Sequence, residues 1–496
     1  MARNRQLLTL DLESGLSRKE RKAAAKARRA LLAAPDVADA QARREQAEAL
    51  KADRLANPVL PRNGLPGEAR TMYPAAPAAL ATFQADPHQA TSNTWSVAYP
   101  FLAEGGLGSS GTYVGRDAAG DGSFCFDPWV LYEKGIITSP NIMTSGMVGA
   151  GKSFTAKALV TRSVALGRKA YVPGDPKGEW TRVAEYVGGK AIALGAGSGA
   201  KLNPLDEGPR SAAFADDVAW ADAVRNRRLR LLEGLVGAEL ERPLGPIERA
   251  AITAALAFAV ANRMPLVLPT IARLLSRPAP SMDERLAEAA FTCGTALDHL
   301  CTGSLSGIFD GPSTVTFDPT LPMLSLDLSR VATGADPKVL SMLMLCASSW
   351  MESSLQNPDG TKRFVVYDEA WALMKSPQVL AQMNAQWRMA RQWGIANFFI
   401  FHQLGDLDQL ASEADREMAK GLMANSGTRI LFRQEADQIP RMREVLGLTR
   451  TQASLIPQLG AGKSSTAMWC IGTRTFLVQT VPTDTELRAF DTDENM

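Results

Sequence analysis

The most restrictive feature of this sequence is the segment GMVGAGKS at residues 146–153, which matches the pattern G-x₄-G-K-[ST]. An apolar run at residues 142–144 precedes it, and residues 154–166 have the composition of a helix. The glycines allow a tight turn in which successive N–H groups point inward, and the start of the helix adds the positive end of its dipole. A strand, a glycine-rich loop and a helix in this order predict a phosphate-binding loop, and this setting disfavours a chance match.

The loop predicts a nucleotide site that takes ATP and Mg²⁺. We expect the Lys152 ammonium to bind the β- and γ-phosphate oxygens and the Ser153 hydroxyl to ligate Mg²⁺. The expected ATP-binding residues are Gly146, Met147, Val148, Gly149, Ala150, Gly151, Lys152, Ser153 and Phe154.

A pair of carboxylates follows a second apolar run, FVVYDE, at residues 364–369. A buried strand that ends beside a phosphate loop would place Asp368 in the Mg²⁺ shell and let Glu369 polarise the attacking water. The alternative is a pair that only caps a strand end or forms salt bridges. The neighbouring phosphate loop favours the catalytic interpretation.

Three further polar residues, in two segments, are candidates for the same site. The apolar run at 396–401 ends in His402 and Gln403, and a polar residue at the tip of an adjacent strand can sense the γ-phosphate, so we assign Gln403 that role. Arg388 and Arg391 are three residues apart, on one face of an expected helix. They form either a solvated basic face or an arginine finger that reaches the ATP of a neighbouring subunit.

Apolar strands alternate with helical stretches from residue 141 onward, which predicts an α/β fold with a mainly parallel sheet and helices on both faces. Between about 211 and 300 the strand signals stop, and the Ala-, Leu-, Arg- and Glu-rich sequence predicts an all-α insertion. Two late strands are expected to form a hairpin that turns at Gly472 and Thr473. The expected strands are 142–144, 170–173, 191–194, 323–327, 364–367, 396–401, 428–432, 466–471 and 475–480.

The sequence before the phosphate loop changes character three times. Residues 1–60 predict a basic, Ala-rich arm, helical or disordered, and residues 61–92 a Pro- and Ala-rich linker. Residues 93–135 predict a few short strands, and residues 136–496 the main domain. The formal net charge is only +2, so the charge of the whole chain does not argue for a nucleic-acid partner. No apolar run approaches the ~20 residues of a membrane span, so no integral membrane segment is expected.

From about residue 124 to 493 the chain resembles the TraC-like motor ATPases of type IV secretion and conjugative transfer, which belong to the HerA–FtsK superfamily of RecA-like P-loop ATPases. The resemblance is carried by the phosphate loop, GDPKGEW (174–180), LNPLD (202–206), FDGPST (309–314), VVYDEAW (365–371), RQWG (391–394) and His402-Gln403. It implies a RecA-like core with an all-α insertion and a homohexamer with ATP between subunits. It also implies that Arg391 is the finger. Asp175, Lys177 and Glu179 match the family's D-P-K-G-E segment, whose role the sequence does not define.

The resemblance implies a hexameric ATPase that energises transfer of DNA or protein across the bacterial envelope, with secretion-channel components as partners and DNA as a candidate partner. The family usually has a long N-terminal domain, whereas about 140 residues precede the loop here. The remnant at 93–135 would correspond to its end, and channel docking would use the basic arm or a separate protein. The alternatives are a cytosolic DNA translocase and an ATP-dependent assembly platform. Either way the expected location is the cytoplasm, or the inner face of the membrane through partners.

Overall fold

The computed structural model of the chain describes Lys19, Lys22, Lys26 and most of residues 106–490. Within 106–490 the residues that it does not describe are 121, 196, 211–213, 215, 333–335, 356–359, 371–372, 374–375, 377–378, 382, 385–386, 388–390, 402–419, 422, 424 and 461–464. Contacts divide the chain into the units Met1–Gln89 and Ala90–Met496.

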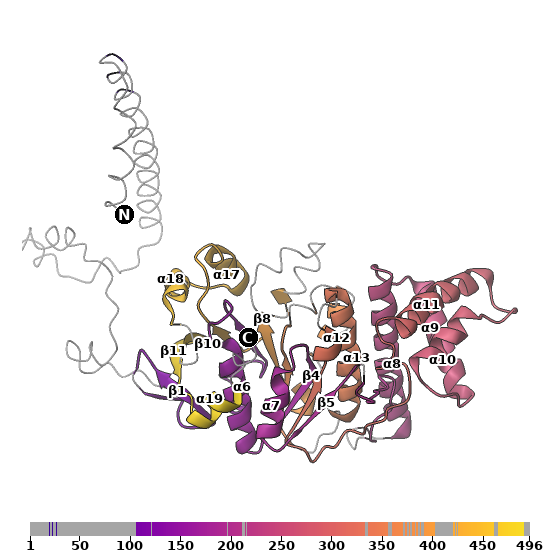
Figure 1. The fold of residues 1–496 in the computed structure, drawn as a ribbon, viewed down its shortest axis with the longest axis horizontal. Coiled ribbons are helices and arrows are strands. Elements are labelled where there is room, and N and C mark those ends of the chain that lie inside the picture. Colours follow the sequence, from indigo (N-terminus) through magenta and orange to yellow (C-terminus); the bar gives the residue numbers. More distant parts are fainter. Residues whose placement is uncertain are drawn as a thin grey trace, which may run out of the picture. The chain divides into compact units, whose positions relative to one another are not determined.

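The second unit is an α/β structure built on one large sheet, and Figure 1 shows its elements in the order of the chain. The strands are β1 (Thr112–Asp117), β2 (Ser123–Phe126), β3 (Ile142–Ser145), β4 (Lys169–Asp175), β5 (Lys190–Ala193), β6 (Met323–Asp327), β7 (Arg363–Tyr367), β8 (Ile395–Phe401), β9 (Thr428–Leu431), β10 (Thr466–Ile471) and β11 (Arg474–Thr480). The helices are α5 (Pro128–Glu133), α6 (Lys152–Ala165), α7 (Glu179–Tyr186), α8 (Asp217–Glu239), α9 (Pro246–Ala261), α10 (Leu268–Ser276), α11 (Glu284–Thr302), α12 (Ser329–Ala332), α13 (Pro337–Leu355), α17 (Ile439–Leu446), α18 (Arg450–Leu455) and α19 (Asp484–Phe490), with short 3₁₀ turns η1 (Arg391–Trp393) and η3 (Ile456–Gln458).

In the described residues the sheet has the order β2-β1-β11-β10-β9-β3-β8-β7-β4-β6-β5. The strands from β9 to β5 pair in parallel, whereas β9, β10, β11, β1 and β2 pair antiparallel. The phosphate-loop strand β3 lies inside the parallel part, between β9 and β8. The carboxyl ends of parallel strands meet at one edge, so this order gathers the carboxyl ends of β3, β8, β7 and β4.

Both faces of the sheet are covered, which explains why its central strands are continuous apolar runs. Every residue of β7 and β8 is buried. Phe364 and Val366 join a hydrophobic cluster with α5, α6, α7 and α19, whereas Val365 and Tyr367 join a second cluster with α13 and the helices of the insertion. Alternate side chains of one strand therefore pack on opposite layers.

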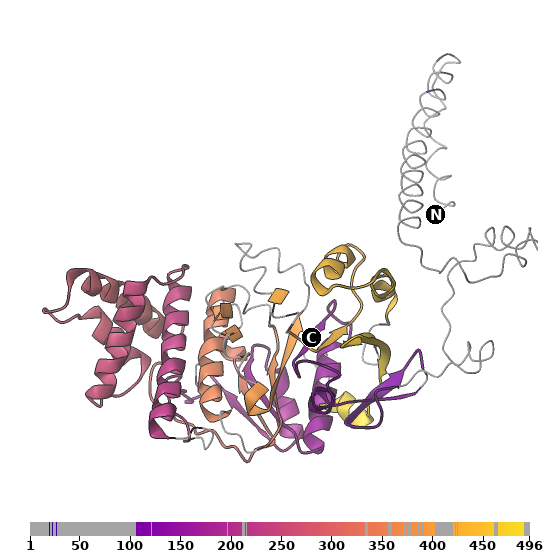
Figure 2. The same cartoon turned by 180° about the vertical axis from the view of Figure 1, so that it is seen from behind.

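The helical insertion is present as α8 to α11, which lie together at the β5 end of the sheet (Figure 2). Asp216 is the N-cap of α8 and Asp283 is the N-cap of α11, because each carboxylate accepts at least one backbone N–H group of the first turn of its helix. The insertion's apolar side chains continue the cluster formed with α13. Within the described residues, no helix combines the length and the apolar character that crossing a bilayer requires.

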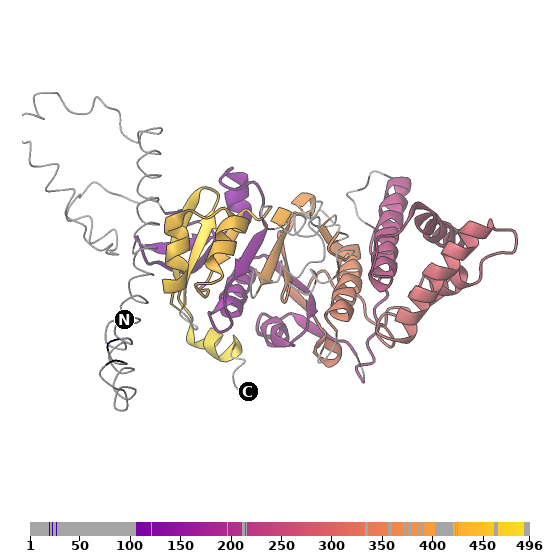
Figure 3. The same cartoon turned by 90° about the horizontal axis from the view of Figure 1, so that it is seen from above.

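The strand predictions agree with the structure to within one or two residues, including the hairpin of β10 and β11. The short strands predicted in 93–135 are present as β1 and β2, and β1 hydrogen-bonds to β11, so the two strands extend the main sheet. Figure 3 shows these N-terminal strands beside the C-terminal ones at one end of the sheet. This pairing satisfies backbone groups of β11 that would otherwise lack a strand partner and moves the edge of the sheet to β2.

Candidate active site

The phosphate loop connects β3 to α6 and has the backbone that its glycines permit. Gly149 and Gly151 adopt left-handed conformations, with φ of 75° and 95°. Helix α6 begins at Lys152, and Gly151 at its N-cap gives it no side-chain cap. The first N–H groups of the helix are therefore not bound by a capping side chain, an arrangement suited to an anion.

The strand next to β3 fixes where the loop starts. A Cβ atom on Gly146 would lie 2.4 Å from Cβ of Phe432, so only glycine allows this close approach. The Met147 N–H donates to the Arg433 carbonyl at 2.9 Å, and Gln434 donates to the Ser145 hydroxyl at 3.2 Å. Residues that follow β9 thus hold the entry to the loop, a contribution that the motif itself does not reveal.

Lys152 is buried, and its Nζ donates to the Met147 carbonyl of its own loop at 2.8 Å. Burial lowers the pKa of the ammonium to about 8, while the nearby Asp368 and Glu369 carboxylates favour the charged form. The structure therefore brings together the lysine and the carboxylate pair that the sequence analysis grouped, although more than 200 residues separate them in the chain.

Asp368 and Glu369 directly follow β7, and both are buried. The Asp368 carboxylate accepts the Trp180 indole N–H at 2.8 Å and the Glu369 backbone N–H at 3.0 Å. Burial raises the pKa of the Asp368 carboxyl above its ordinary value, and the negative charge of Glu369 raises it further. A cation bound to Asp368 would relieve this cost, as the predicted Mg²⁺ site requires.

Glu369 has a left-handed backbone, with φ of 56°. For a residue with a side chain this conformation costs on the order of 1–3 kcal/mol and is typical of functional positions. Its carboxylate forms an ion pair with Lys177. The strained backbone and the ion pair together fix where the Glu369 side chain lies.

Sequence reasoning missed the residues that support this carboxylate pair. Trp180 and Lys177 both come from the GDPKGEW segment, which was singled out only by resemblance. In the structure it forms the end of β4, the following loop and the start of α7. The available signal was its position directly after a buried strand, the same placement that identified Asp368 and Glu369.

For two predicted site residues, Gln403 and Arg391, the structure does not describe the side chain. Gln403 lies outside the described residues, immediately after β8. Arg391 begins the 3₁₀ turn η1 just before β8, but its side chain lies outside the described part, as does Arg388. Their roles remain predictions.

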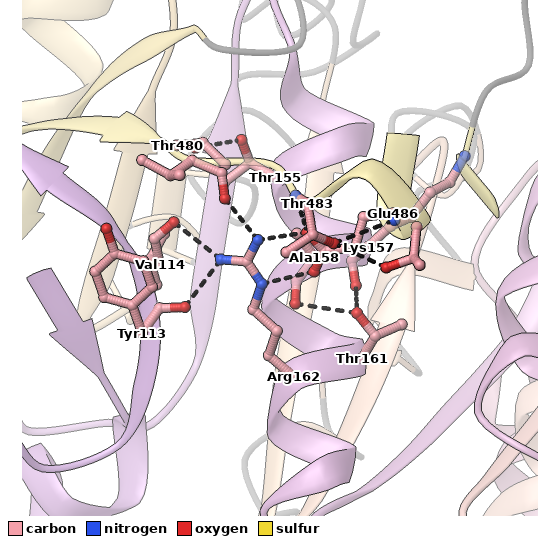
Figure 4. Close-up of polar contacts among 12 residues, drawn as sticks. Tyr113, Val114, Thr155, Lys157, Ala158, Thr161, Arg162, Thr480, Thr483 and Glu486 are labelled. Atoms are coloured by element: carbon pink, nitrogen blue, oxygen red, sulfur yellow. Dashed lines mark hydrogen bonds and ion pairs between the residues drawn. The ribbon is translucent and has the colours of Figure 1, made fainter. Parts of the chain in front are cut away.

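Helix α6 is also anchored far from the loop, at Arg162 (Figure 4). The guanidinium donates twice to the Glu486 carboxylate, at 2.6 and 2.5 Å, and also to the Tyr113, Val114 and Val481 carbonyls, at 2.9, 3.1 and 2.7 Å. These bonds account for all five of its N–H groups. They tie the phosphate-loop helix to β1 and to the segment around α19.

The site's residues fit ATP with Mg²⁺. The loop offers N–H groups not bound by a capping side chain and a buried ammonium, which suit phosphate oxygens, while the Ser153 hydroxyl and the Asp368 carboxylate are oxygen ligands of the kind Mg²⁺ prefers. Glu369 adds a second carboxylate beside the first. This is the chemistry of nucleoside triphosphate hydrolysis.

Together the fold and the site define a class. A mainly parallel sheet with a phosphate loop after β3 and acidic residues after β7, covered by helices on both faces and carrying an all-α insertion, is the RecA-like P-loop ATPase fold. No protein-family model and no curated protein sequence matches the chain.

Several solved structures share this fold. The structure of VirB4 of Thermoanaerobacter pseudethanolicus superposes with a TM-score of 0.63 at 20% identity, over 78% of this chain and 100% of that one. The plasmid coupling protein TrwB in complex with ADP and Mg²⁺ superposes with a TM-score of 0.52 at 11% identity, over 82% and 99%. TrwB with a non-hydrolysable ATP analogue gives the same TM-score over 81% and 97%. The chain therefore has the fold of ATPases from conjugation and type IV secretion.

Proposed function

We propose that this protein is an ATP-hydrolysing motor of a conjugative or type IV secretion-like system, working as a homohexameric ring that energises transfer of DNA or protein across the bacterial envelope. The observation that carries the proposal is the convergence of Lys152, Asp368 and Glu369 at the start of α6, on a sheet shared with VirB4 over that protein's whole chain. Channel components and DNA are its proposed partners, at the inner face of the membrane.

Each site residue has a defined task in this mechanism. ATP with Mg²⁺ supplies the phosphoanhydride that is cleaved. The loop's N–H groups and Lys152 would bind the phosphates, and Ser153 and Asp368 would hold the metal. Glu369 would orient water and accept its proton, because it is a second carboxylate held beside Asp368. Gln403 would sense the terminal phosphate.

Arg391 is proposed as the finger that reaches the nucleotide of the adjacent subunit. Such residues contribute about 10³–10⁵ in rate. R391A should therefore nearly abolish turnover while the isolated subunit keeps its ATP affinity. Mixed rings of R391A and K152A subunits should regain activity, because some interfaces would pair an intact Lys152 with an intact Arg391. No rescue in proven mixed rings would remove the finger role.

An assembly platform is the alternative from a different class, in which nucleotide binding holds a complex together and turnover is incidental. The strained conformation of Glu369 argues against it, because binding alone does not require a carboxylate held at this cost. A cytosolic DNA translocase shares the same site and differs in its substrate and partners.

The experiment that tests the proposed function measures ATP turnover with and without single- and double-stranded DNA, with particle size recorded in parallel. A motor of this kind should form rings and hydrolyse ATP. Stimulation by DNA that falls steeply with salt would favour a DNA-handling motor. Absence of turnover under every condition, in a folded oligomer, would favour the platform and contradict the proposal.

A further inference from the structure

The segment that joins β4 to the first turn of α7 contacts both carboxylates of the candidate site. Within four residues of chain, Trp180 at the start of α7 donates its indole N–H to Asp368, and Lys177 in the preceding loop pairs with Glu369. Neither residue belongs to the phosphate loop or to the acidic strand end. The loop and the start of α7 are therefore a third component of the site.

This loop is held firmly on both sides of Lys177. The Asp175 carboxylate accepts the backbone N–H groups of Glu179 and Trp180, at 3.2 and 2.7 Å. Glu179 forms an ion pair at 2.6 Å with Lys157, a buried lysine on α6. The start of α7 is thus fixed against the phosphate-loop helix, and Lys177 extends from a fixed base.

Gly178, which follows Lys177, allows this arrangement. It has φ of +70°, and a Cβ atom there would lie 3.3–3.4 Å from Ser329 and Asp327. The tight turn at Gly178 directs the chain from Lys177 into α7.

Lys177 and Lys152 differ in their freedom although they interact with the same two carboxylates. Lys152 is 4% exposed and is bonded within the loop, whereas the Lys177 side chain is 52% exposed. The two ammonium groups repel each other, and both are attracted to Asp368 and Glu369. Lys177 is therefore the cation of this cluster that can move when further negative charge arrives.

The contact partner of Lys177 indicates which phosphate it would serve. Lys152 lies in the loop that would bind the β- and γ-phosphates. Lys177 forms its ion pair with Glu369, the carboxylate proposed to orient water toward the terminal phosphate. An ammonium at this position is useful for a triphosphate and has no counterpart to bind in a diphosphate.

We propose that Lys177 is a nucleotide-sensing positioning residue, which restrains Glu369 through their ion pair and binds the terminal phosphate when a triphosphate enters. This inference rests on the proposed function, since it assumes that ATP occupies the loop. It assigns Lys177 two exchangeable partners, and it makes the position of Glu369 depend on the nucleotide state.

The test is equilibrium binding of Mg²⁺–AMP-PNP and Mg²⁺–ADP to the full chain by calorimetry. K177M should weaken AMP-PNP binding about ten-fold, the low end for a charge-assisted hydrogen bond because Lys177 is half exposed. It should change ADP binding less than about two-fold. The matched control is K201M, since Lys201 is similarly exposed and pairs with Asp310 at 2.9 Å. K201M should change neither affinity.

K152A separates failure of this inference from failure of the proposed function. If K152A loses both nucleotides and K177M keeps the wild-type ratio of the two affinities, Lys177 does not contact the terminal phosphate. An equal loss of both nucleotides in K177M would also overturn the inference. If K152A binds both nucleotides normally, the phosphate-loop assignment itself fails.

A second variant, E369Q, tests the same exchange of partners with Lys177 still in place, so its own affinities do not depend on the folding of K177M. E369Q removes the partner that competes for the ammonium, so AMP-PNP affinity should rise at least three-fold while ADP affinity stays constant. The gain should shrink when K177M is added to E369Q. An equal gain in both backgrounds would assign the effect to the lost carboxylate charge and overturn the exchange of partners.

Discussion

The parallel and antiparallel parts of the sheet divide two tasks between them. The parallel strands β9, β3, β8, β7 and β4 end in the segments that carry the candidate chemistry. The antiparallel strands β10, β11, β1 and β2 come from the two ends of the described chain and carry none of the proposed catalytic residues. Two of them, β1 and β11, hydrogen-bond to helix α6. The phosphate loop is thus supported by chain segments that lie far from it in sequence.

The supporting contacts run along the length of α6. Thr155 bonds to Thr480 at 2.9 Å, and Ser163 bonds to Thr112 at 2.9 Å. Phe154, directly after the predicted Mg²⁺ ligand Ser153, packs against Phe490 of α19 with ring centroids 5.8 Å apart. If the comparison is correct, changes in the parallel part should reduce turnover, and changes in the antiparallel part should reduce stability first.

Among changes that leave Lys152 and Arg391 in place, the largest expected effect comes from removing the charge of Glu369. E369Q keeps the shape of the side chain but cannot accept a proton from water, so turnover should fall about 10²–10⁴-fold. Binding of Mg²⁺–ATP should persist, and steady-state hydrolysis with parallel calorimetry checks both. E435Q, at an exposed position shortly after β9, is the control and should retain wild-type turnover. Wild-type hydrolysis by E369Q would assign the catalytic role to another acidic residue.

The next effect tests the antiparallel part. R162A removes all five hydrogen bonds of the guanidinium and leaves the buried Glu486 carboxylate without its cation, which should cost about 3 kcal/mol of unfolding free energy. Denaturant unfolding followed by circular dichroism measures it. R242A is the matched control, because Arg242 also binds a glutamate, Glu248, with two hydrogen bonds. The Arg242 side chain is half exposed, so R242A should lower the free energy of unfolding by less than about 1 kcal/mol. Equal costs would show that the Arg162 contacts are not a special anchor.

A smaller effect concerns pH. Burial opposes ionisation of Glu486, but the hydrogen bonds from Arg162 and Thr483 outweigh it and lower the pKa of this carboxyl in the folded state. A lowered pKa adds stability above the unfolded value of about 4.3, and this stability is lost as pH falls through the folded value. E486Q should therefore be less stable than wild type by about 2 kcal/mol at pH 7. The difference should shrink below pH 4, and a difference independent of pH would contradict the assignment.

How far the sequence predicts this structure depends on how local the information is. The strands β3, β7 and β8 were predictable because strands covered on both faces are continuous apolar runs. Lys152, Asp368 and Glu369 were predictable because each follows such a run. The pairing of Arg162 with Glu486 spans 324 residues, and that of Trp180 with Asp368 spans 188. No local pattern encodes these contacts.

The N-terminal strands depend on a distant partner in the same way. The alternation in 93–135 indicated strands but contained nothing about their partner. β1 pairs with β11, which lies more than 300 residues later in the chain. The GDPKGEW segment shows the intermediate case: its position after a strand placed it at the right edge of the sheet, while its contacts with Asp368 and Glu369 became visible only in the fold.

The smallest expected effect is that of removing residues 1–60. This arm belongs to the unit Met1–Gln89, whereas the sheet belongs to the other unit, and the apolar residues of the arm are mostly alanine with no aromatic side chain. The truncated protein should unfold within about 0.5 kcal/mol of the full chain and keep basal ATP turnover. Loss of soluble, folded protein would show that the arm supports the sheet and would extend the supporting region beyond the antiparallel strands.

The most direct test of the central claim is nucleotide binding and ATP turnover of K152A. Lys152 is the buried cation of the phosphate loop, so its removal should abolish turnover and weaken both ATP and ADP binding beyond detection, while circular dichroism shows an intact fold. K201A, a lysine paired at the surface, should behave as wild type. A folded K152A protein that hydrolyses ATP at the wild-type rate would contradict the assignment of this loop as the site of ATP hydrolysis.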